Sequence, residues 1–214
     1  MKERTKAFVD SFFLRNEALC PMREQILEAA DILLTAFRNG NKLLLCGNGG
    51  SCADCDHIAG ELLKGFLLKR PVPALADKLQ QQYGQEGLAL GQKLQQGLPV
   101  ISLCTHAAAI SAFANDVDPE LVYAQQVLAY GQPGDVLLGI STSGNAGNVA
   151  KAVMTANALR MQTVGLTGKN GGHLAALSQL ALIMPQQETY RIQEMHLAVY
   201  HLLCAVVESE LFEN

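Results

Sequence analysis

The chain has no excess of basic residues. Its 16 Lys and Arg are outnumbered by 20 Asp and Glu, for a formal net charge of −4. A nucleic-acid partner bound through a basic surface is therefore not expected. No uninterrupted apolar run has the length that spans a bilayer, and no apolar signal segment follows the charged residues 1–6. We expect a cytoplasmic protein without a membrane partner.

Two nucleotide-binding motifs are also missing. The chain contains neither GxxxxGK[ST] nor GxGxxG, so neither a nucleoside triphosphate loop nor a dinucleotide site is indicated. Cys52 and Cys55 form one CxxC, but there is no second CxxC to complete a zinc site, and Asp56 rather than His follows. We interpret this spacing as coincidence. The six cysteines read as reduced core thiols: Cys20, Cys46, Cys52, Cys55, Cys104 and Cys204.

Apolar residues make up 49% of the 214, which is enough for a substantial core. Helical spacing predicts helices over residues 1–40, and Gly40 is a plausible stop. Short apolar runs then alternate with helical segments, so we expect one domain over residues 1–214. The predicted strands are 42–46, 100–103, 135–140, 163–167 and 180–184, and the predicted helices that follow four of them are about 52–66, 107–114, 147–159 and 188–211.

Short, uniformly apolar strands between helices are typical of a parallel sheet that is buried on both faces. Such sheets bind ligands at the carboxyl ends of their strands. Three of the five predicted strands end there in turns rich in Gly, Ser or Thr, at residues 47–51, 141–145 and 168–172. We therefore expect the ligand at this edge of the sheet.

Residues 69–97 interrupt the pattern with two prolines and a Gln-rich stretch. The composition predicts an exposed, partly helical insertion. A tolerated surface loop and a functional lid or subunit contact are equally compatible with it.

The turns at residues 47–51 and 141–145 have the composition of phosphate-binding loops. Small residues let the backbone approach a ligand, and the helix that follows offers unpaired N–H groups and a partial positive charge. The hydroxyls of Ser51, Ser141, Thr142 and Ser143 add further donors. One such loop alone would be read as a turn, but two of them favour a phosphate site.

Candidate proton carriers follow the first loop. His57 and Glu61 are four residues apart, so they share a helix face, and a partly buried carboxylate there could move a proton between sugar carbons. The alternative is that His57 and Glu61 form a surface pair that contributes little. Gln193 and His201 lie on the last helix about 12 Å apart along its axis. That separation argues against one shared metal ion, unless a neighbouring subunit contributes.

Four segments carry a family resemblance: GNGGSCADCDHIAGEL, AFANDVDPELVYAQQV, PGDVLLGISTSGNAGNV and RIQEMHLAVYHLLC. Through them the chain resembles the sugar isomerase (SIS) family and, within it, the bacterial phosphoheptose isomerases. The resemblance implies a three-layer α-β-α sandwich around a five-stranded parallel sheet. It also implies a homotetramer that interconverts the aldose and ketose forms of a seven-carbon sugar phosphate, sedoheptulose 7-phosphate, through an enediol.

The resemblance also implies residue roles. Glu61 matches the catalytic base and His201 the catalytic acid. Zinc ligands of some members match His57, Glu61, Gln193 and His201. The substrate and phosphate contacts match Asn48, Gly49, Ser51, Asp116, Ser141, Thr142, Ser143 and Gln193.

The chain departs from the family pattern at Ala146, Tyr190 and His106, and in its long insertion. These departures bear on the substrate more than on the chemistry. Related SIS proteins include non-catalytic regulators of replication initiation, so a phosphosugar-binding regulator is the alternative. Those regulators lack residues that match Glu61 and His201, and the presence of both here favours an enzyme.

Overall fold

The computed structural model describes residues 1–213, and its centre is a five-stranded parallel sheet with the strand order β2-β1-β3-β4-β5. Every strand lies within one residue of its predicted bounds, because a run of apolar side chains buried on both faces is a strong local signal. The strands are β1 Leu43–Gly47, β2 Val100–Ser102, β3 Val136–Ser141, β4 Gln162–Gly168 and β5 Leu180–Met184.

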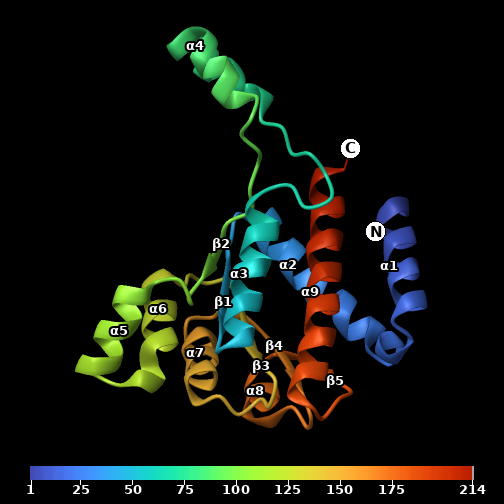
Figure 1. Ribbon diagram of the computed structural model, residues 1–214, viewed down its shortest axis with the longest axis vertical. Coiled ribbons are helices and arrows are strands. Elements are labelled where there is room, and N and C mark those ends of the chain that lie inside the picture. Colours follow the sequence, from blue (N-terminus) through green and yellow to red (C-terminus); the bar gives the residue numbers. More distant parts are fainter. Residues whose placement is uncertain (214) are drawn as a thin grey trace.

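Helices cover both faces of the sheet, which confirms the predicted three layers (Figure 1). Alternate β1 side chains face opposite cores: Leu43 and Leu45 join one, Leu44 and Cys46 the other. The first face carries α1 Glu3–Arg15, α2 Arg23–Arg38, α3 Gly50–Leu63 and α9 Thr189–Phe212. The second carries α5 Ala107–Asp116, α6 Val122–Tyr130, α7 Gly147–Ala158 and α8 Gly172–Leu177.

Short helices complete the connections. The 3₁₀ turn η1, Glu17–Met22, holds Pro21 and separates α1 from α2, while η2, Pro119–Leu121, leads into α6. Gly40 has φ +77°, which suits the left-handed position after a helix, so the predicted stop of α2 is confirmed. The sequence did not predict α6 or α8.

The insertion is helical and projects from the body of the protein (Figure 1). It holds α4, Pro73–Gly91, which Gly84 breaks into two arms through a positive φ of 63°. A β-bridge between Pro71 and Gln95 closes the base of this hairpin. The prediction of an exposed, partly helical insertion is confirmed, whereas a role as lid or subunit contact stays a prediction.

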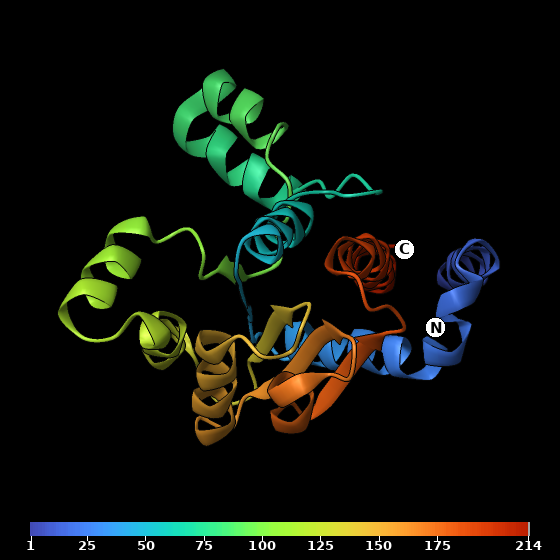
Figure 2. The same cartoon turned by 60° about the horizontal axis from the view of Figure 1, so that its bottom comes forward.

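By length and composition α9 is apolar enough to cross a membrane, but most of it is buried inside this protein. It packs against α1, α2 and α3, and Figure 2 shows it end-on between α1 and α3. This helix is therefore the centre of one core.

His196 on α9 is a polar side chain inside that core. Its ring is completely buried; Nε2 lies 3.1 Å from the Thr167 carbonyl oxygen, and Nδ1 has no partner among the described residues. Burial outweighs the Thr167 contact and lowers the pKa of His196 to about 4. The native state therefore keeps this imidazole neutral where the unfolded chain would bind a proton.

We expect the free energy of unfolding to fall as the pH drops from about 6.5 to about 4, because the unfolded state binds the extra proton in this window. His196 alone contributes about 3 kcal/mol to that loss. His196→Gln keeps a donor toward Thr167 and should flatten the curve in denaturant titrations. A curve as steep as that of the unchanged protein would contradict this assignment.

Candidate active site

The two phosphate-loop candidates lie side by side at the carboxyl edge of the sheet. β1 pairs with β3, and the register sets Gly47 beside Ile140, so Asn48 and Ser141 follow at the same level. The chain leaves β1 toward β2 on one side, while β3 lies on the other. This reversal of direction is the topological switch point where doubly wound sheets bind ligands.

Side-chain hydrogen bonds tie the two loops together. The amides of Asn48 and Asn148 bond reciprocally, with N···O distances of 2.8 and 2.9 Å. The Tyr123 hydroxyl donates to the Gly47 carbonyl oxygen at 2.5 Å. Asn148 is the second residue of α7, so the first loop is joined to the helix that follows the second loop.

A third loop supports the second. Gly144 has φ +70°, and a Cβ there would collide with the carbonyl of Gly171 in the β4–α8 loop. Leu174 N–H donates to the Gly144 carbonyl at 2.9 Å. Only glycine fits at position 144, and this close approach holds the loop that carries Thr142 and Ser143.

Several hydroxyls in these loops have no protein partner. Within residues 1–213 the side chains of Ser51, Ser141 and Thr142 make no hydrogen bond, whereas Ser143 Oγ accepts from Asn145 N–H at 3.2 Å. Ser51 and Ser141 are buried; α3 begins at Gly50, within the first loop, and α7 begins at Gly147, just after the second. The arrangement offers donors and two helix N-termini to an anion.

Gln193 joins this anion site. Its side-chain amide lies directly against Gly50, where an added Cβ would collide with Nε2. Since His57 is seven residues further along α3, about 10 Å separates the two positions along the axis. The structure thus places Gln193 with the phosphate loop, away from the other three residues that match zinc ligands.

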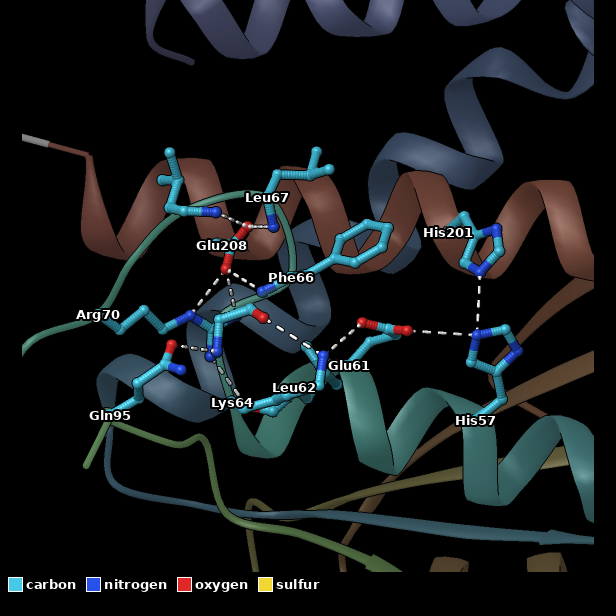
Figure 3. A network of polar contacts seen from close by, with 12 residues as sticks. His57, Glu61, Leu62, Lys64, Phe66, Leu67, Arg70, Gln95, His201 and Glu208 are labelled. Atoms are coloured by element: carbon cyan, nitrogen blue, oxygen red, sulfur yellow. Dashed lines mark hydrogen bonds and ion pairs between the residues drawn. The ribbon is translucent and has the colours of Figure 1, made fainter. Parts of the chain in front are cut away.

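Those three side chains meet between α3 and α9 (Figure 3). His57 Nε2 lies 3.3 Å from Glu61 Oε1 and 3.4 Å from His201 Nε2, and Lys64 Nζ is 3.2 Å from Glu61 Oε2. α3 supplies His57 and Glu61, and the parallel helix α9 supplies His201. The i and i+4 spacing in the sequence therefore indicated only the two residues from α3. Within residues 1–213, no three His, Cys, Asp or Glu side chains form a complete metal-ligand set.

The surroundings shift the pKa values of His201 and of the nearby Asp54. Burial, and then the neighbouring His57, lower the pKa of His201, so its imidazole is neutral at neutral pH. Burial raises the pKa of Asp54, against the opposing effect of a hydrogen bond from Tyr200. Tyr200 and Asp54 were absent from the predicted site, because nothing in their spacing brings them together.

Asp116 is not brought to the loops within this chain. It is exposed at the end of α5 and accepts a hydrogen bond from its neighbour Asn115 at 2.9 Å. α5 contacts η2 and α6 and lies on the outer side of α6 (Figure 1). Its substrate role stays a prediction.

The cysteine prediction needs a correction. Cys20 is exposed, and Cys52 and Cys104 are only partly buried, so the six thiols are not all in the core. Cys104 lies 3.4 Å from the Gly47 carbonyl oxygen, beside the first phosphate loop. Hydrogen bonding from the Cys55 thiol lowers the pKa of Cys104 to about 6, against the effect of burial.

A buried carboxylate anchors the chain where α3 ends (Figure 3). Glu208 accepts hydrogen bonds from the backbone N–H groups of residues 66, 67 and 68 at 2.6–3.0 Å, and from Arg70 Nε at 2.8 Å. Arg70 also donates to the Leu62 carbonyl at 2.9 Å. Both side chains are almost fully excluded from solvent. We name Glu208 and Arg70 the buried clamp.

The buried clamp positions an aromatic neighbour of His201. It holds the backbone of Phe66, whose ring stacks on His201 with centroids 5.6 Å apart and planes inclined by 25°. Sequence reasoning missed both clamp residues, since a Glu late in α9 and an Arg before two prolines carry no joint signal.

The sequence pattern of the SIS domain matches residues 14–85 and 74–168. The chain therefore belongs to the SIS domain family, as the sequence segments indicated. The fold agrees: the structure of a phosphoheptose isomerase from Neisseria gonorrhoeae superposes with a TM-score of 0.74 at 34% identity, covering 97% of this chain and 98% of that one.

Relatives named phosphoheptose isomerase match over most of the chain. The phosphoheptose isomerase of Trichlorobacter lovleyi is 38% identical over 207 residues, covering 97% of this chain and 93% of that protein. The phosphoheptose isomerase of Helicobacter hepaticus is 41% identical over 189 residues, covering 88% and 84%.

Replacing Glu208 should be among the most damaging changes on α9. Glu208→Ala leaves Arg70 as an unpaired buried charge and three N–H groups without their acceptor, so we expect a loss of about 3–5 kcal/mol in the free energy of unfolding. Chemical denaturation measures it, with Glu24→Ala, an exposed residue of α2, as the control. A loss equal to that of the control would contradict the clamp.

Proposed function

We propose that this protein is a phosphoheptose isomerase, which interconverts the ketose sedoheptulose 7-phosphate and the corresponding aldose. The observation that carries the proposal is identity of 38–41% to phosphoheptose isomerases over most of the chain. The geometry supports it: two loops with free donors lie at the switch point, and further along α3 Glu61 lies beside His57, which in turn contacts His201.

The phosphate end of the substrate would be held by the first two loops. Ser51, Ser141 and Thr142 have hydroxyls without protein partners, and Gln193 adds an amide over Gly50. The N-termini of α3 and α7 contribute partial positive charge to a dianion. In a heptose 7-phosphate the exchanging carbons lie at the far end of the sugar from the phosphate, as the proton carriers lie further along α3 than the anion site.

Glu61 would act as the base. It removes the proton from the carbon that bears a hydroxyl beside the carbonyl, and His201 protonates the carbonyl oxygen to give an enediol. Glu61 then returns the proton to the adjacent carbon, while the other hydroxyl loses its proton to His201. Each proton that Glu61 gains or His201 loses in the first half is restored in the second, so no external oxidant is required.

Zinc is a further part of the proposal. A tetrahedral ion with bonds of about 2.0–2.1 Å sets its ligands about 3.3–3.4 Å apart. The two separations from His57 Nε2, to Glu61 and to His201, are of this size. Gln193 would have to leave Gly50 to join them. If bound here, zinc would polarise the carbonyl oxygen of the substrate.

We expect added zinc to raise the melting temperature of the unchanged protein after chelation, and to have a smaller effect on His57→Ala, because a ligand that binds only the native state stabilises it. Thermal denaturation measures this without reference to activity. An equal rise in both proteins would remove His57 from the ligand set.

A homotetramer is proposed from the family resemblance. The resemblance implies active sites at subunit interfaces, and among the described residues Asp116 makes a side-chain hydrogen bond only with Asn115. Light scattering after size-exclusion chromatography determines the mass, and a monomer that is active at high dilution would refute the shared site.

The central test is Glu61→Gln. We expect turnover of sedoheptulose 7-phosphate to fall by about 10²–10⁴-fold, since the amide cannot accept the carbon-bound proton. Circular dichroism should be unchanged, and Glu24→Gln serves as the control. Incorporation of solvent deuterium into the sugar must fall in parallel.

Retained exchange in Glu61→Gln would assign the base elsewhere. Binding of the sugar phosphate by the unchanged protein without any exchange would instead identify a regulator.

A further inference from the structure

A chain of three polar side chains runs behind the proton carriers. The Tyr200 hydroxyl donates to Asp54 Oδ1 at 3.3 Å and lies 2.9 Å from His57 Nδ1. His57 presents its other nitrogen, Nε2, to Glu61 and His201 (Figure 3). Asp54 and His57 lie one turn apart on α3, and Tyr200 reaches them from α9.

Counting protons decides the direction of each bond. A hydroxyl has a single proton, and an ionised carboxylate can only accept. Once Tyr200 donates to Asp54, its oxygen can only accept from His57, so the His57 proton must be on Nδ1. Nε2 then carries the lone pair.

This tautomer has two consequences at the reacting edge. With no proton on His57 Nε2, Glu61 Oε1 receives no hydrogen bond from His57 and stays free to take a carbon-bound proton. The lone pair on His57 Nε2 is also what a zinc ion between His57 and His201 would require, and the two Nε2 atoms lie 3.4 Å apart. The opposite tautomer would donate to Glu61 and occupy the base.

Two members of this hydrogen-bond chain have buried polar groups, whereas the His57 side chain is 42% exposed. The Tyr200 side chain is 1% exposed, and Asp54 Oδ2 is buried without a partner among the described residues. An unsatisfied buried acceptor costs about 1–3 kcal/mol. Asp54 carries this cost at the position where its other oxygen holds the Tyr200 hydroxyl.

We propose that Tyr200 and Asp54 are positioning residues that hold His57 as its Nδ1–H tautomer, and thereby keep Glu61 free of a hydrogen bond from His57. Groups behind a functional imidazole commonly set its tautomer in this way. The catalytic part of this inference rests on the proposed isomerase function, whereas the tautomer itself does not.

The tautomer is measured directly by ¹⁵N chemical shifts in protein labelled at histidine, at neutral pH, with His57→Asn to assign the signal. We expect Nε2 of His57 to be unprotonated in the unchanged protein. Tyr200→Phe keeps the ring but removes the acceptor, and Asp54→Asn can donate to the Tyr200 oxygen and release its proton toward Nδ1. Both variants should shift His57 toward the Nε2–H tautomer.

Turnover supplies the second readout. We expect kcat to fall about 10-fold or more in both variants, with KM changed less than about twofold, as is common when a group that orients an active imidazole is lost. Tyr83→Phe, on the exposed hairpin, is the matched control and should change neither readout.

An Nε2–H signal in the unchanged protein, an unshifted tautomer in both variants, or an unchanged kcat despite a shifted tautomer would each overturn the proposal. The two proposals fail separately. If the unchanged protein isomerises no sugar phosphate but its tautomer responds to both variants, the isomerase function is wrong and the hydrogen-bond chain stands.

Discussion

The parallel packing of α3 against α9 is the contact on which the rest of this site depends. Their pairing brings Gln193 to Gly50, His201 to His57 and Glu208 to the end of α3, in the same order along both helices. The sheet imposes that direction, because both helices lie on one face and each returns the chain antiparallel to the strands. A change in the axial offset of the helices by one turn, about 5.4 Å, would separate all three pairs at once.

Buried polar groups on α9 and on the neighbouring α3 fall into two kinds. Glu208 is fully satisfied by three backbone donors and an arginine, which makes it an anchor. Asp54 Oδ2 and His196 Nδ1 are buried without partners. The satisfied group lies at the exit from α3, while Asp54 lies behind His57 and the Tyr200 hydroxyl. A folded protein can tolerate a few buried polar atoms without hydrogen-bond partners when its main core is large and apolar.

Sequence patterns predicted what is local and missed what is distant. The five strands were found to within one residue because each is a short apolar run, and the anion loops were found because Gly, Ser and Thr gather where strands end. The reciprocal pair of Asn48 and Asn148 spans 100 positions, and the contact of Tyr200 with His57 spans 143. No periodicity encodes such partners, since they depend on which helices become neighbours. Asp116 shows the reverse case: a motif supplied the residue, but one chain does not supply its contact.

The hairpin at α4 enters and leaves the body through adjacent positions. The β-bridge between Pro71 and Gln95 joins the segment that enters the hairpin to the segment that leaves it. Beside this bridge, Gln96 N–H donates to the Arg70 carbonyl at 2.7 Å. Because the gap to be closed is so short, evolution could acquire or shed this module without altering the path of the surrounding backbone. The same junction is a natural graft point, where an engineer could exchange the arm for a foreign domain and keep the helices beneath it in place.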